Sequence, residues 1–162
     1  TYHAVQPVST IKKYFVYIPY KAETIPGFFH SLLRIWNIAR NSGAVIEFYA
    51  FTPPIEVLKR IIKKANIEAK FIAVKGWVDV EKATENMSEN EGLIIIMNRH
   101  ESLYASKSKN FIPDVLSRDF AHVNYLLIYP FSEDNENLLE KRSINNYDDY
   151  SEIGSIIGKL FK

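Results

Sequence analysis

The sequence lacks cysteine entirely: none occurs among its 162 residues. This absence excludes disulfide bonds, thiolate metal sites and a cysteine nucleophile, and it fits a reducing compartment. The chain also lacks a charge imbalance, because 20 lysines and arginines are matched by 19 aspartates and glutamates. A net charge of +1 provides no long-range field for nucleic acid or an anionic membrane. Composition therefore argues against a nucleic-acid-binding protein.

Long hydrophobic runs are absent as well. No apolar run reaches the roughly 18 residues that a membrane-spanning helix needs, and no signal-peptide pattern opens the chain. The longest runs, such as Leu93–Met97, have the length of a strand. The chain begins with Thr1 rather than methionine, which we interpret as processing or as a segment of a longer protein. With 47% hydrophobic residues, the chain can fill the core of one domain.

Five apolar segments, rich in aromatic and β-branched residues, favour strands. The expected strands are Tyr14–Ile18, Ala44–Phe51, Ile67–Val74, Leu93–Met97 and Val123–Tyr129. The first and fourth are apolar on both faces, as in parallel strands that helices cover from both sides.

Between these strands, apolar residues recur at intervals of three to four, which predicts helices. Thr24 is the expected N-cap of the first helix, and Gly43 lies where a C-cap glycine belongs. The later helices are expected to begin at Thr52, at Asp79 and near Pro113.

This alternation predicts right-handed βαβ units and one parallel sheet. We therefore predict an α/β fold over residues 1–131, namely a three-layer α/β/α sandwich with a five-stranded parallel sheet. Doubly wound sheets of this size order their strands 2-1-3, or an equivalent, around a switch point where ligands bind at the strands' carboxyl ends. Residues 1–12 are expected to be a polar lead-in.

Residues 132–162 are expected to be an acidic linker followed by a C-terminal amphipathic helix. An apolar stripe at helical spacing is formed by Ile153, Ile156, Ile157, Leu160 and Phe161. The stripe could pack on the same sheet, contact a second subunit, or lie on a membrane, although its polar face carries little positive charge. We favour a dimer contact, because the predicted sheet already has enough helices to cover it.

The layout of residues 12–130 resembles the universal stress protein family. The run Glu91–Met97 is similar to that family's acidic residue followed by Leu-Ile-Val-Met, and Val123–Pro130 stands where the family has its last strand. The resemblance implies a universal stress protein-like (adenine nucleotide alpha hydrolase-like) fold.

Nucleotide-binding members of that family carry G-x2-G-x9-G-[S/T] after strand four, where glycines let backbone N–H groups approach phosphates. In this chain the four positions hold Asn98, Glu101, Phe111 and Ile112, and the family's terminal aspartate of strand one falls at Pro19. The resemblance therefore implies a degenerate loop and argues against nucleotide binding.

The candidate ligand-binding residues lie at the predicted carboxyl edge of the sheet. They are Pro19, Tyr20, Asn98, Arg99, His100 and Glu101. Arg99 could clamp an anion and His100 could respond to pH near neutrality, whereas the simpler interpretation is a polar surface loop.

A basic helix face could meet anionic lipid or the acidic segment 133–140, but most such faces are simply solvated. It consists of Lys59, Arg60, Lys63 and Lys64. The four histidines show no ligand spacing, so no metal site is predicted. No catalytic constellation or cofactor motif is present, and we predict a non-enzymatic domain.

The sequence further resembles divergent modules in the cytoplasmic C-terminal region of bacterial cation/proton (Na⁺/H⁺) antiporters. This implies a regulatory or assembly domain of an inner-membrane protein, dimeric and partnered by a transmembrane transport domain of the same polypeptide. The alternative is a free-standing stress-protein-like domain that binds a nucleotide or another small anion. A third hypothesis is a phosphate-handling hydrolase that uses His100 and Glu101.

Overall fold

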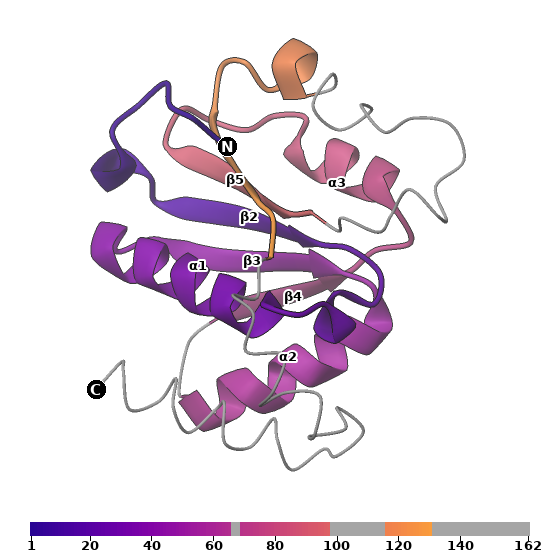
Figure 1. The fold of residues 1–162 in the computed structure, drawn as a ribbon. Helices are drawn as coiled ribbons and strands as arrows, with labels where there is room; N and C mark the ends of the chain where they lie inside the picture. Colours follow the sequence, from indigo (N-terminus) through magenta and orange to yellow (C-terminus); the bar gives the residue numbers. More distant parts are fainter. Residues whose placement is uncertain (66–68, 98–115, 131–162) are drawn as a thin grey trace.

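A computed structural model describes residues 1–65, 69–97 and 116–130, and its centre is a single twisted sheet (Figure 1). Its strands are β1 (Tyr2–His3), β2 (Lys13–Ile18), β3 (Val45–Ala50), β4 (Ala69–Ala73), β5 (Glu91–Ile96) and β6 (Asn124–Ile128). They lie side by side in the order β1-β6-β5-β2-β3-β4. The pairs from β6 to β4 are parallel, which confirms the α/β class and the parallel core of the sheet.

The predicted strand count is wrong, because the sheet has six strands rather than five. The additional strand, β1, pairs antiparallel with β6, with Tyr2 opposite Leu126 and His3 opposite Tyr125. The His3 and Tyr125 rings stack with centroids 4.8 Å apart. A strand of two residues is too short to show periodicity, so it could not be predicted within residues 1–12.

The strand order, which the sequence leaves open, is visible in the sheet. Counted along the chain, the parallel strands β2 to β6 are arranged 3-2-1-4-5, since β3 and β4 lie on one side of β2 and β5 and β6 on the other. This is the order of the first five strands in a Rossmann-like doubly wound sheet. The switch point therefore lies between β2 and β5.

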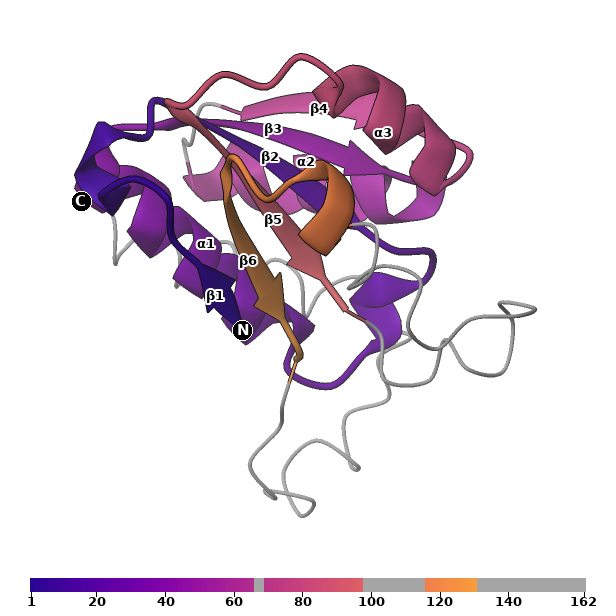
Figure 2. The ribbon, with the colours of Figure 1, turned by 90° about the horizontal axis from the view of Figure 1, so that it is seen from above.

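Helices cover both faces of the sheet (Figures 1 and 2). On one face lie α1 (Phe28–Ser42) and α2 (Thr52–Ala65), with the 3₁₀ turns η1 (Val8–Thr10) and η2 (Ala22–Thr24) at the ends of β2. On the other face lie α3 (Trp77–Thr84) and a helical segment at residues 116–119. The described residues thus form the three layers that the sequence predicts.

Two helix starts differ from the expectation. Thr24 is not an N-cap, because it belongs to η2 and its hydroxyl donates to the Lys21 carbonyl at 2.7 Å. Asp79 does not open α3 either: it lies inside the first turn, and its carboxylate accepts the backbone N–H of Lys75 at 2.7 Å. In both cases a short polar side chain forms a hydrogen bond within a nearby turn. The sequence alone does not distinguish this role from that of an N-cap.

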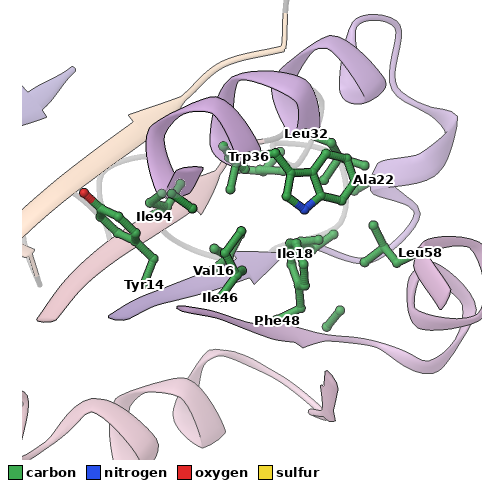
Figure 3. Close-up of a cluster of buried hydrophobic side chains, with 14 of the residues drawn as sticks. Tyr14, Val16, Ile18, Ala22, Leu32, Trp36, Ile46, Phe48, Leu58 and Ile94 are labelled. Atoms are coloured by element: carbon green, nitrogen blue, oxygen red, sulfur yellow. The ribbon is translucent and has the colours of Figure 1, made fainter. Parts of the chain in front are cut away.

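The core is divided by the sheet into two clusters. On the α1/α2 side, alternate strand residues such as Val16, Phe48 and Ile94 pack against Leu32 and Trp36 (Figure 3). On the α3 side, the intervening residues pack against the opposite layer; they include Phe15, Tyr17, Tyr49, Leu93, Ile95, Val80 and Leu116. Each such side chain contributes about 1.5–3 kcal/mol when fully buried. Burial on both faces explains why β2 and β5 are apolar beyond their first residues, Lys13 and Glu91.

The predicted C-cap of α1 is confirmed, and it gives a stability prediction. Gly43 has φ 66°, in the left-handed region, and open space surrounds the position of its missing Cβ. Gly43→Val should therefore lower the free energy of unfolding by about 1–2 kcal/mol through backbone strain alone. Gly43→Asn should cost less than half as much, because asparagine tolerates this conformation. Urea unfolding measures both, and equal losses would contradict the explanation.

Candidate functional site

The strongest candidate site by topology is the carboxyl edge of the sheet beside β2. In sheets of this type the connections after the two strands at the switch point run to opposite faces, and ligands bind there. The connection after β2 runs through Pro19, Tyr20 and Lys21 into η2. The connection after β5 leaves at Met97, whose N–H donates to the Ile128 carbonyl at 2.8 Å. Residues 98–115 lie outside the described part of the chain.

The chain turns sharply after β2. Pro19 is buried, and its carbonyl accepts the Ala22 N–H at 3.3 Å. Lys21 is the one non-glycine residue with positive φ in the described ranges, at 58°, which costs about 1 kcal/mol or more. Strained residues of this kind concentrate at functional sites, so the turn is the part of this edge most suggestive of function.

An aromatic pair covers the ends of β2 and β3. The Tyr20 and Phe51 rings meet edge to face with centroids 5.5 Å apart. Tyr20 is 51% exposed, and the Lys21 ammonium lies 5.4 Å from its ring centroid. This arrangement offers a flat aromatic surface with one cation beside it.

A buried carboxylate oxygen lies close by in sequence. Glu23 Oε2 is buried, and it has no hydrogen-bond partner among the residues that the structure describes. Buried polar atoms are nearly always paired, so an unpaired one calls for a reason. A carboxylate at this edge opposes a bound phosphate through like-charge repulsion.

The other predicted site residues are only partly placed. Pro19 and Tyr20 do lie at the carboxyl edge. Two other groups lie outside the described residues: the loop residues Asn98, Arg99, His100 and Glu101, and the C-terminal stripe Ile153, Ile156, Ile157, Leu160 and Phe161. On α2, the side chains of Lys59, Arg60 and Lys63 are exposed; that of Lys64 is not described. Lys59 lies 3.7 Å from Glu56, in a pair that is more than half exposed and adds little stability.

No cluster of potential metal ligands occurs within residues 1–65, 69–97 and 116–130. Over the same ranges, every helix is too short or too polar to cross a bilayer.

Sequence reasoning missed a row of charged side chains near the amino ends of four neighbouring strands. Lys13 of β2 bonds Glu91 of β5 at 2.6 Å, and Glu47 of β3 accepts from Lys70 of β4 at 2.9 Å. Tyr49 donates its hydroxyl to Glu47 at 3.3 Å. Glu47 is only 9% exposed. An acidic residue inside an apolar strand was the available signal, since glutamate is rarely buried without a partner.

Burial and charge shift the pKa values in this row. Burial, followed by the neighbouring Glu47 carboxylate, raises the pKa of Tyr49 to about 12, so its hydroxyl remains protonated. Burial alone would raise the pKa of Glu91, but hydrogen bonds from Lys13 and Ser88 outweigh it and lower the pKa below 4.5. Both groups are thus held in fixed protonation states at neutral pH. The ion pairs Lys13–Glu91 and Lys70–Glu47 each link two neighbouring strands.

No protein-family model matches the chain, and no curated protein or solved structure matches it either.

The Lys13–Glu91 pair gives a pH prediction. Because the pKa of Glu91 is lowered in the folded state, the Lys13–Glu91 pair contributes to the free energy of unfolding above about pH 4.5. This contribution is lost as the pH falls through the folded pKa. Lys13→Met should lower the free energy of unfolding at pH 7 by about 1 kcal/mol. It should also make that free energy fall less steeply as the pH drops below 4.5. Lys59→Met, at an exposed pair, should leave the profile unchanged. Urea unfolding from pH 7 to pH 2.5 tests this, and an unaltered slope in Lys13→Met would contradict it.

Proposed function

We propose that this chain is a non-catalytic regulatory or assembly domain of universal stress protein-like type, belonging to a bacterial cation/proton antiporter. In this proposal its partner is the transmembrane transport domain of the same polypeptide. It lies in the cytoplasm as a homodimer, with residues 150–162 forming the contact. The universal stress protein-like part of the proposal is supported by the resemblance of Glu91–Met97 and by the order of elements, and the antiporter context is an analogy to cytoplasmic modules of that type.

One observation supports the non-catalytic, nucleotide-free part of the proposal: the turn at the carboxyl end of β2. Its first residue, Pro19, has no N–H to donate to a phosphate, and Glu23 adds a buried carboxylate oxygen nearby. Among the described residues at this edge, Tyr20 is exposed and meets the partly buried Phe51 edge to face. A surface of this chemistry suits contact with protein better than capture of a polyanion.

Regulation would then occur by coupling between domains. A change in the dimer, in pH or in a bound ligand would favour one of two conformations of this domain. If the transport domain contacts these two conformations differently, its own conformational equilibrium would shift as well.

The antiporter proposal predicts the outcome of a transport experiment. In the complete reading frame, about ten or more hydrophobic spans should be encoded together with this domain. Removal of the domain should leave cation/proton exchange in membrane vesicles measurable but shift its activation by pH or ligand, because the domain biases the conformational equilibrium and carries no ion. A reading frame without such spans would contradict the proposal. So would an activation profile identical with and without the domain.

A second candidate function is binding of a nucleotide or small anion at the same edge. The specific observation in its favour is the Lys21 ammonium beside the exposed Tyr20 ring, since a base could stack on the ring while the lysine met a phosphate.

Calorimetric titration with ATP, ADP and AMP separates the two functions. We expect no affinity tighter than about millimolar, because the turn after β2 carries one lysine, a proline without an N–H group and a buried carboxylate oxygen at Glu23. Lys21→Ala and Lys12→Ala form a matched pair of exposed-lysine variants at the two ends of β2. Micromolar affinity that is lost in Lys21→Ala and kept in Lys12→Ala would establish the second function instead.

A further inference from the structure

A cavity of about 230 Å³ lies far from the carboxyl edge, between the first halves of β5 and β6 and the last turns of α1. Its walls come from the lead-in, the sheet and the helix: they include Tyr2, Val8, Tyr14, Ile38, Asn124 and Leu126. Tyr14 stands at one end of the core cluster on this face (Figure 3). The proposed regulatory function does not use this cavity.

A glycine positions the Tyr14 ring, which forms one wall of the cavity. Gly92 of β5 lies between Tyr14 of β2 and Asn124 of β6 in the register of the sheet. A Cβ at Gly92 would approach Tyr14 Cε1 to 2.7 Å, so the absence of a side chain lets the Tyr14 ring lie over the strand.

Asn124, on the other side of Gly92, turns toward the lead-in. Its Oδ1 accepts the N–H groups of Val5 at 2.7 Å and Gln6 at 2.8 Å, and its Nδ2 donates to the Gln6 carbonyl at 2.7 Å. These bonds hold the lead-in over the sheet as a wall of the cavity. They also satisfy the amide, which therefore has little hydrogen-bonding capacity left for a ligand.

The chemistry of the walls limits what can enter. All side chains around the cavity are uncharged, and most are apolar. Burial, followed by the nearby Tyr2, raises the pKa of Tyr14 despite an opposing hydrogen bond from Ser42, so this hydroxyl is neutral at physiological pH. Tyr2 is 48% exposed, which places it at the rim. Ions would lose part of their hydration here without compensation, whereas apolar molecules would cover apolar walls that water can reach.

We propose that this cavity is a binding site for a small, neutral, bicyclic aromatic molecule. Its volume, about 230 Å³, is about one and a half times the roughly 150 Å³ of an apolar cavity that takes benzene. Tyr2 and Tyr14 line it, and their rings suit edge-to-face contact with an aromatic ligand. The tyrosine hydroxyls can bond one polar atom of such a ligand.

Indole is the probe that fits this description, and ligand-observed NMR with calorimetry on the full chain measures its binding. We expect a Kd on the order of 0.1–1 mM, given how few atoms the ligand has. Benzene should bind more weakly because it fills less of the space. Indole-3-acetate should bind at least tenfold more weakly than indole, because its carboxylate would be desolvated without a partner.

Filling the cavity should abolish binding. Ile38→Phe places a larger side chain in the wall and should weaken indole binding at least tenfold, whereas Leu33→Phe, the same kind of change in α1 at a position that does not line the cavity, should not. Val8→Trp fills the site from the lead-in and serves if Ile38→Phe is not folded by circular dichroism.

Three results would overturn the proposal. The first is no indole binding at its solubility limit, and the second is unchanged affinity in both folded filling variants. The third concerns another occupant, the apolar stripe at residues 153–161. If Ile157→Asp tightens indole binding tenfold or more, the cavity is a docking site for the chain's own C-terminal segment and not for a free ligand.

Discussion

The structure depends on one constraint: both faces of the central strands must be removed from water. Residues Tyr14–Ile18 of β2 are all buried, and side chains alternate between the two faces. Helices must therefore pack on each side. Because the crossovers are right-handed, they place helices on both faces only if some strands are added on one side of β2 and the later strands on its other side. The reversal of strand addition between β2 and β5, and thus the location of the candidate edge, follows from this requirement.

The parts of the fold that could be predicted from sequence are those that local periodicity encodes. The parallel strands and the end of α1 at Gly43 belong to this class, since hydrophobic alternation and a C-cap glycine are local signals. The order 3-2-1-4-5 could not be predicted, because it depends on which strands pair over long distances. Strand β1 could not be predicted for the same reason, because its two residues form a strand only by pairing with the distant β6.

The candidate sites divide in the same way. Pro19 and Tyr20 were predictable because the end of an apolar strand marks the edge of a sheet. The Tyr20–Phe51 contact and the cavity beside Gly92 were not, since each brings together residues from separate elements. Glu47 stands between these cases. Its presence in an apolar strand is visible in the sequence, and Tyr49, two residues on, shares its face, but its partner Lys70 is known only from the register.

The cavity beside Tyr14 has a consequence for the heat capacity of the domain. Its rim residue Tyr2 is 48% exposed, so water can reach the apolar walls of the cavity. A ligand that covers these walls removes apolar surface from water, and such burial lowers the heat capacity of the system. The temperature dependence of a binding enthalpy therefore reports whether apolar surface in this cavity has been covered.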